Sequence, residues 1–219
     1  MLNNANKTAA DLASENGQAE IATFIAEHKA DENVRNKTRS TTLDTQYGAD
    51  EDGKDQEKAS LHTASEEGKA HVIKSLLEQG SDINARNAQF VTPLHIAAVQ
   101  GNLEIVGLLI ERGAEVDPCD MWGCVPLHLA SRFGHLEVSR ELVNHGANVN
   151  SRNQDRWAPI HLSAGNGHLG IVKLLLERGA DVHAVNGEGE TAYQISLVFG
   201  YGEIADLLLE HGAGRARFD

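Results

Sequence analysis

Aromatic residues are scarce in this chain of 219 residues, since Phe, Tyr and Trp together make up 5% of it. Such a supply is thin for one large globular core, and it favours small modules packed by Leu, Ile, Val and Ala. Cysteine is scarcer still, and two cysteines make no disulfide framework. Long apolar runs are missing as well, so no segment is predicted to span a membrane. We therefore expect a cytoplasmic protein built from small repeated units.

Positive charge is also in short supply. The chain has 19 Lys and Arg against 32 Asp and Glu, which gives a formal net charge of −13. Affinity for nucleic acid comes largely from Lys and Arg side chains that displace counterions from phosphates. The acidic excess therefore argues against a nucleic-acid partner.

A unit of 33 residues recurs along the chain. Tetrapeptides similar to Thr-Pro-Leu-His occur at residues 59–62, 92–95, 125–128, 158–161 and 191–194. Two glycine series keep the same spacing: Gly68, Gly101, Gly134, Gly167 and Gly200, and then Gly80, Gly113, Gly146, Gly179 and Gly212. Glycine readily adopts the left-handed conformation that ends a helix. Each unit is therefore predicted to hold two helices, each ending at a glycine.

Apolar residues between these glycines follow helical spacing. Leu94, Ala97 and Ala98 lie three and four positions apart, so the first helix of a unit shows one apolar face. In three units this helix is predicted to begin at a proline, where a missing N–H costs nothing: Pro93, Pro126 and Pro159. Polar segments that favour hairpin-like fingers follow the second helix, at residues 81–84, 114–117, 147–150 and 180–183.

The tetrapeptide, the glycine after it, an Ile-Val-x-Leu-Leu-like helix and a Gly-Ala-Asp-Val-Asn segment together resemble the ankyrin repeat. The resemblance implies an all-α solenoid of stacked helix pairs with β-hairpin-like fingers, and a protein-binding function without catalysis. It covers five units, at about 58–87, 88–120, 121–153, 154–186 and 187–219. Helices this short cannot bury their faces alone, so the units must stack on one another.

Residues 1–30 hold a sixth, divergent unit that is out of phase with the others. Gly17 precedes Gly68 by 51 residues, which is 18 more than one unit. Residues 31–57 are acidic, lack apolar periodicity, and are predicted to form a linker or a long loop. Two interpretations of residues 1–30 stay open: an amino-terminal cap of the array, or the end of an upstream array.

Several residues have the type but not the arrangement of a chemical site. Residues 48–55 have the glycine and lysine spacing of a phosphate-binding loop, but Asp55 replaces the required Ser or Thr. Cys119 and Cys124 are expected to be free thiols. A histidine recurs every 33 residues, at His62, His95, His128 and His161. Units about 10 Å apart cannot share a zinc ion, and ankyrin-like repeats use this histidine to brace the finger by hydrogen bonds. We predict no cofactor, no metal and no catalytic group.

Residues that differ from unit to unit on one exposed face are the candidates for binding. The resemblance implies that this face consists of the fingertips and the concave side of the first helices. We predict that a protein or peptide partner contacts eight residues there: Phe90, Met121, Trp122, Arg132, Phe133, Arg156, Trp157 and Phe199. Trp and Arg are common among residues that dominate interface energetics. The alternative is that large side chains on neighbouring fingertips pack on one another.

One position of the finger turn differs in kind between units. It holds Phe90 and Arg156 in two units, and Gly123 and Gly189 in two others. If the turn keeps a positive φ, a bulky residue costs on the order of 1 kcal/mol there, and residues held against such strain often serve function.

The charge of the same face is expected to change along the array. It is acidic at the first unit, at Glu57, Glu66 and Glu67, and basic in the middle, at Arg132, Arg156 and Arg178. Such a division would orient a polar partner. The competing function is a structural spacer of a larger repeat protein, without a dedicated ligand, that self-associates through its repeat ends.

Overall fold

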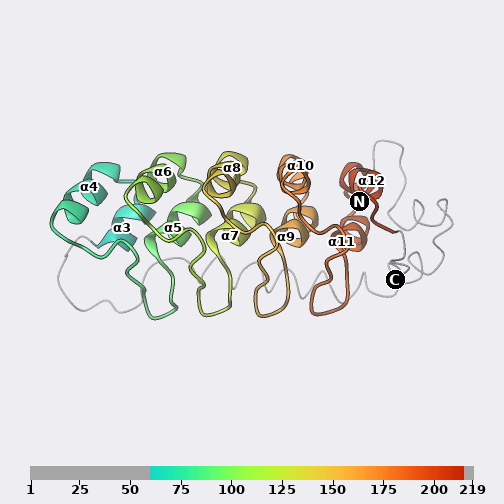
Figure 1. Cartoon of the computed structure of the whole chain (residues 1–219), viewed down its shortest axis with the longest axis horizontal. Coiled ribbons are helices and arrows are strands. Elements are labelled where there is room, and N and C mark those ends of the chain that lie inside the picture. Colours follow the sequence, from blue (N-terminus) through green and yellow to red (C-terminus); the bar gives the residue numbers. More distant parts are fainter. Residues whose placement is uncertain (1–59, 215–219) are drawn as a thin grey trace.

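The computed structural model describes residues 60–214, in which the chain forms five helix pairs (Figure 1). The first helices of the pairs form an inner row: α3 (Leu61–Glu66), α5 (Pro93–Gln100), α7 (Pro126–Phe133), α9 (Pro159–Gly165) and α11 (Ala192–Val198). The second helices form an outer row: α4 (Ala70–Glu78), α6 (Leu103–Glu111), α8 (Leu136–Asn144), α10 (Leu169–Glu177) and α12 (Gly202–Glu210). The divergent unit predicted at 1–30 and the linker predicted at 31–57 lie outside the described residues.

Proline and glycine set the helix ends. Pro93, Pro126 and Pro159 are the first residues of α5, α7 and α9. Every glycine of the two series has a positive φ, from 68° at Gly101 to 96° at Gly212. The N–H of the residue after such a glycine bonds to a carbonyl five residues earlier, a pattern that closes a helix at a left-handed residue. The predicted helix starts and stops are therefore confirmed.

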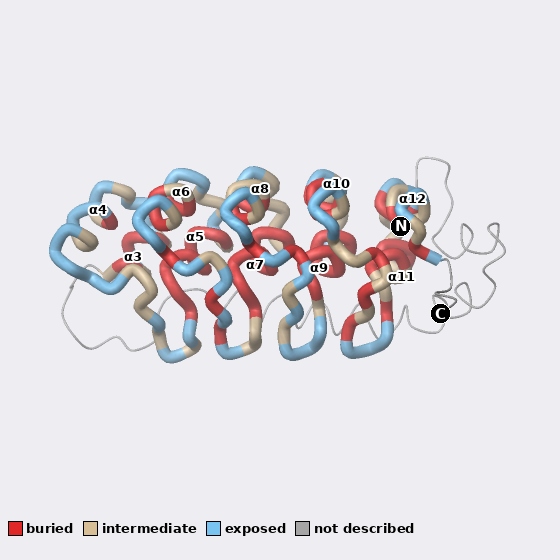
Figure 2. The backbone as a smooth tube through the Cα atoms, viewed as in Figure 1, coloured by how far each residue is buried: buried red, intermediate tan, exposed pale blue. Residues whose placement is uncertain are grey.

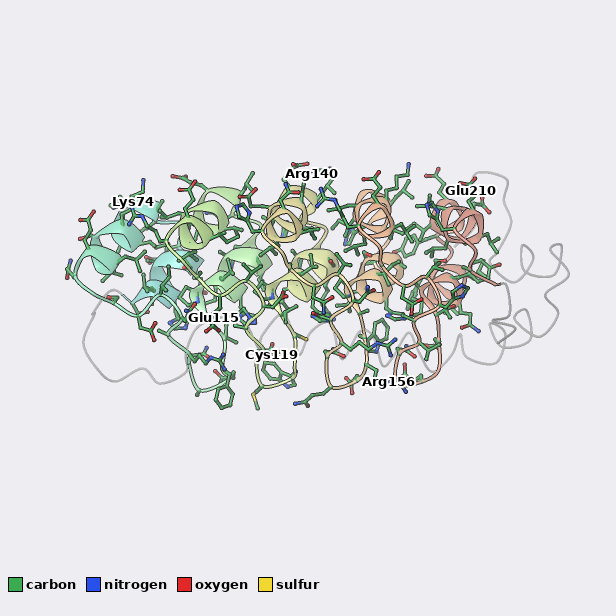
Figure 3. All side chains as sticks on the ribbon, in the orientation of Figure 1. Lys74, Glu115, Cys119, Arg140, Arg156 and Glu210 are labelled. Carbon is green, nitrogen blue, oxygen red and sulfur yellow. The ribbon has the colours of Figure 1, made fainter. Side chains whose placement is uncertain are left out.

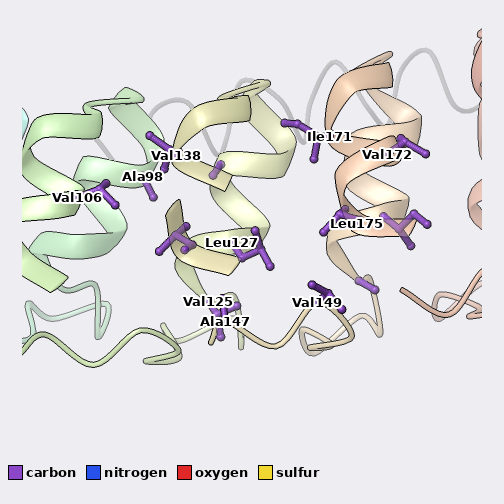
Figure 4. Close-up of a cluster of buried hydrophobic side chains, with 14 of the residues drawn as sticks. Ala98, Val106, Val125, Leu127, Val138, Ala147, Val149, Ile171, Val172 and Leu175 are labelled. Carbon is purple, nitrogen blue, oxygen red and sulfur yellow. The ribbon is translucent and has the colours of Figure 1, made fainter. Parts of the chain in front are cut away.

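One continuous apolar core lies between the two rows (Figure 4). Leu127, Val138, Ile171 and Leu175 are at most 1% exposed. The buried residues of this core are Leu, Ile, Val and Ala, with Tyr193 as the single aromatic among them. Burial follows the facing sides of the rows, whereas much of the outer row and of the finger ends is exposed (Figure 2). No described helix has both the length and the apolar composition that crossing a bilayer requires.

The described residues include four fingers, which connect each outer helix to the inner helix of the next pair and project beyond the inner row, at 79–92, 112–125, 145–158 and 178–191. The extended pairing among the described residues is one antiparallel bridge between Val185 and Thr191, so the fingers are hairpin-like loops. Backbone hydrogen bonds tie successive tips together: Met121 N–H to the Gln89 carbonyl at 2.9 Å, Gln154 N–H to Trp122 at 2.9 Å, and Gly187 N–H to Asp155 at 2.8 Å.

Candidate protein-binding surface

A histidine holds each of the first four inner helices to the base of the following finger. His128 in α7 accepts the Val125 N–H at Nδ1, at 3.1 Å. Its Nε2–H is directed at the carbonyls of Ser151 and Trp157, at 3.1 and 3.0 Å, on both legs of the third finger. The bracing predicted for these histidines is confirmed. The same bond recurs from His62 to Val91 at 2.9 Å, from His95 to Cys124 at 3.1 Å and from His161 to Ala184 at 2.8 Å.

Burial keeps the central histidines neutral. It lowers the pKa of His95 and of His128 to about 4 and also lowers the pKa of His161, because a charged ring would lose its water. The hydrogen bonds to finger carbonyls partly oppose the shift. Since Nδ1 accepts and Nε2 donates, both ring nitrogens are already engaged with the backbone. Within residues 60–214, no group of three or more His, Cys, Asp or Glu is placed to hold a metal ion.

An Asn or Asp holds each fingertip turn from inside, which sequence reasoning missed. Asp120 Oδ1 accepts the N–H groups of Trp122 and Cys124, at 2.9 and 2.8 Å. Short acceptor side chains commonly bond to the backbone N–H groups that follow them in turns. The 33-residue spacing of these residues was the signal that could have revealed them. The equivalent residues in the other fingers are Asn87, Asn153 and Asn186.

A side chain from the next pair covers the end of each of the first four inner helices. The His135 ring lies so close to Gly101 that a Cβ there would be 2.4 Å from His135 Nδ1. His135 also donates Nε2–H to the Val99 carbonyl of α5, at 2.8 Å. His168 covers Gly134 in the same way. These glycines are therefore required both by their positive φ and by the ring above them.

The fingertip turn has a positive φ in all four described fingers. It is 76° at Gly123 and 81° at Gly189, and it is 60° at Phe90 and 59° at Arg156. Among residues 60–214, Phe90 and Arg156 are the two non-glycine residues with a positive φ. The positive φ on which the argument for strain at this position depended is thus confirmed. A left-handed conformation costs a residue with a Cβ on the order of 1 kcal/mol.

The first two fingertips carry the most exposed apolar side chains. Phe90 is 52% exposed and Met121 is 45% exposed, and the third large exposed apolar residue of the described part, Leu103, begins α6. Trp122 is half-buried and packs against a finger-base cluster. The buried members of the finger-base cluster are Val91, Ile96, Cys124 and Leu129. Trp122 therefore packs in part within the fingers, and the rest of its side chain stays exposed.

The third finger presents a guanidinium and a second tryptophan. Arg156 is exposed, and its side chain has no hydrogen bond or ion pair with the rest of residues 60–214. Figure 3 places Arg156 on the finger side of the solenoid, away from Arg140 on the outer row. Trp157 is half-buried, with its ring edge-on to His161 at a centroid distance of 6.0 Å.

Arg132 and Phe133 end α7 and are both half-buried. The Arg132 guanidinium lies 5.8 Å from the centre of the Phe133 ring, which in turn stacks on His135 at 6.4 Å. Burial raises the pKa of Cys124 to about 12, and Arg132 partly opposes this shift. That electrostatic influence links the end of α7 with the second finger.

Phe199 lies apart from the other predicted residues. It directly follows α11, in the last described pair, and is half-buried. A Cβ on Gly165 would lie 4.0 Å from Phe199 Cε2, so this ring approaches the neighbouring inner helix. The structure therefore does not bring Phe199 to the first two fingers.

The charges differ from the expected division. Glu57 lies outside the described residues, and Glu67 forms an ion pair with Lys69 at 2.9 Å. Arg178 follows α10 and donates to Asn144 at the end of α8, at 2.8 Å. It is engaged at the outer row because it directly follows an outer helix. The predicted basic region is thus reduced to Arg132 and Arg156.

Both cysteines are free, as predicted, although their surroundings differ. Cys119 is exposed, whereas Cys124 is buried in the finger-base cluster and accepts a hydrogen bond from Asn153 Nδ2 at 3.6 Å. Residues 48–55, which resemble a phosphate-binding loop, lie outside the described residues.

Aromatic side chains gather outside the main core. Residues 60–214 contain seven aromatic residues, and of these Tyr193 alone is buried. The others are half-buried or exposed: Phe90, Trp122, Phe133, Trp157, Phe199 and Tyr201. The core therefore contains one buried aromatic residue, with Tyr201 packed against it, and the other five aromatic residues lie outside the core.

Stacked helix pairs with projecting fingers define a helical repeat solenoid. A family model described as ankyrin repeats in three copies matches residues 61–153 and 127–217, and the chain belongs to the ankyrin repeat family. Ankyrin repeats are generally protein–protein interaction modules and are typically non-enzymatic. No curated protein matches the chain in a sequence comparison.

Proposed function

We propose that this chain is a non-enzymatic module that binds a protein partner across its fingertips and the concave face of its inner helices. The observation that carries the proposal is the placement of the aromatic residues. Only one of seven in the described part is buried, while Phe90 and Met121 expose about half of their surface on adjacent tips. Exposed apolar clusters of this kind are costly in water unless a partner covers them.

The geometry also supplies a rigid platform for the partner. Asp120 and its equivalents fix each turn, the histidine braces fix each finger base, and backbone hydrogen bonds join one tip to the next. A surface that is already ordered loses little conformational entropy on binding. The free thiols are consistent with an intracellular setting, which is part of this proposal.

A pull-down with the full chain as bait tests the proposal. The test variant is Met121→Gln/Phe133→Ala, in the second finger and at the end of α7. The matched control is Lys74→Ala/Arg140→Ala, on the outer row (Figure 3). We expect proteins retained by the wild type and the control to be lost by the test variant, with the circular dichroism spectrum unchanged. Equal retention by all three baits would contradict the proposal.

The spacer interpretation gives a different result in the same experiment. A spacer without a dedicated ligand retains no protein in a manner that depends on the finger side. Self-association through the repeat ends would instead appear as a concentration-dependent mass in sedimentation. The variant Met121→Gln/Phe133→Ala would not change that mass.

A further inference from the structure

Two fingertips hold a residue with a strained backbone φ and an exposed side chain. Phe90 and Arg156 have φ values near 60°, at the position where the other two described fingers have Gly123 and Gly189. Phe90 exposes half of its surface, and Arg156 is exposed with its guanidinium unpaired within residues 60–214. Neither side chain therefore recovers inside the fold what its backbone conformation costs.

We propose that Phe90 and Arg156 are two anchors for one extended segment of the partner, which places an apolar side chain on Phe90 and a carboxylate on Arg156. The inference rests on the proposed function, because it names the chemistry of the segment that the same surface binds. Phe90 with the neighbouring Met121 offers an apolar contact, and a guanidinium with free donors pairs best with a carboxylate.

Two other arginines of the fingers, Arg86 and Arg152, are less available than Arg156. Arg86 lies 3.8 Å from Glu115, and Arg152 donates to the Val185 carbonyl of the next finger at 3.2 Å. Of these three arginines, Arg156 is thus the one best placed to donate hydrogen bonds to a carboxylate of the partner. Charge complementarity of this kind also fixes the register of a bound segment.

The spacing of the two anchors sets the spacing within the segment. Phe90 is on the first finger and Arg156 is on the third, and backbone bonds at Met121 and Gln154 hold the intervening tips in register. Packed helices lie about 8–10 Å apart, so two steps of the stack separate the anchors by about 16–20 Å. An extended chain rises about 3.3 Å per residue, which places the apolar residue and the carboxylate about five or six residues apart.

Selection of peptides on the full chain tests this inference. The probe is a displayed library of random unmodified peptides of about 16 residues, long enough to span the fingers when extended. We expect the enriched sequences to share an apolar residue and an Asp or Glu at the predicted separation. Affinities of the synthesised peptides are then compared between the wild type, Phe90→Gly and Arg156→Gly.

Each of these variants is expected to weaken peptide binding at least about tenfold, while the melting temperature stays unchanged or rises. The matched control Ala88→Gly alters an exposed residue of the first tip that has an ordinary φ value, and it is expected to change the affinity less than about threefold. For Arg156→Gly the loss shrinks at high salt, because the lost contact is ionic.

Three results would overturn the inference. Enriched peptides could bind all variants equally, they could lack the paired residues, or no peptide could be enriched. The wider proposal is judged separately. A partner that Met121→Gln/Phe133→Ala loses but both glycine variants retain leaves the proposed function standing and removes Phe90 and Arg156 from it.

Discussion

The bases and the tips of the fingers follow opposite rules. At the bases, His95, His128 and His161 are the same residue in successive units, fully buried and hydrogen-bonded to the next finger. At the tips, Phe90 and Arg156 stand where other fingers have glycine, are exposed, and form no side-chain hydrogen bond or ion pair within residues 60–214. Repeated residues thus hold the array together, whereas the residues that vary are free to serve a partner.

The largest expected difference between the finger bases and the fingertips is the loss of stability that acid causes through the base histidines. The folded pKa of His95 and of His128 is about 4, below the value of 6.5 for a free ring, so the unfolded chain binds more protons between these values. The contribution of these two rings to the free energy of unfolding is therefore fully present above pH 6.5. It falls as the pH drops toward 4, by about 2 kcal/mol for each ring at about pH 5. Urea unfolding at a series of pH values measures this loss. A flat profile from neutral pH to about pH 5 would show that the base histidines ionise freely.

Removing one brace tests the base directly. His128→Ala leaves the buried groups of Val125, Ser151 and Trp157 without their partner and opens a cavity, so we expect a loss of about 3–4 kcal/mol. His62→Ala is the control, because His62 is only half-buried and its Nε2 makes one bond to the next finger, to Val91. It should cost about 1 kcal/mol. Equal losses in chemical denaturation would mean that position in the stack does not matter.

Two glycines with the same type of φ sharpen the comparison of covered and open positions. Gly101 and Gly113 have φ values of 68° and 90°, but only a Cβ on Gly101 would clash, with the His135 ring. Gly113→Ala should cost about 1 kcal/mol from strain alone, and Gly101→Ala about 2 kcal/mol or more. Thermal and urea unfolding compare the two, and a larger cost at Gly113 would contradict the role of the ring.

Substitutions at the fingertips should change the free energy of unfolding least. Phe90→Gly relieves a strained φ without removing a buried contact, so the free energy of unfolding should stay unchanged or rise by up to about 1 kcal/mol. The reciprocal control is Gly189→Phe, since a Cβ on Gly189 meets nothing within 4 Å. It should cost about 1 kcal/mol. If Phe90→Gly instead destabilises the protein by more than that amount, Phe90 serves the fold.

The architecture was largely predictable from the sequence because its signals are periodic. Proline at the helix starts, glycine at the stops and histidine at the finger base all recur every 33 residues, and each acts mainly within its own unit or on the next finger. The positive φ at the fingertip also followed, since Gly123 and Gly189 occupy the same position as Phe90 and Arg156.

Contacts between units were harder to predict. The ring of His135 over Gly101 and the capture of Arg178 by Asn144 depend on how neighbouring pairs are placed in space. The same holds for Trp122, whose contact with the finger-base cluster could not be separated from exposure by sequence alone. A residue type indicates what a side chain can do, but its neighbours decide whether it is already engaged.

Amide hydrogen exchange on the full chain, with and without a bound partner, tests the central claim most directly. Slower exchange is predicted at the tips, around residues 88–91, 121–124 and 154–157, and at the end of α7. The amides of α4, α6, α8 and α10 should change little. Protection confined to the outer row or to the terminal pair would contradict the account, because the partner would then bind a surface other than the fingertips and the inner helices.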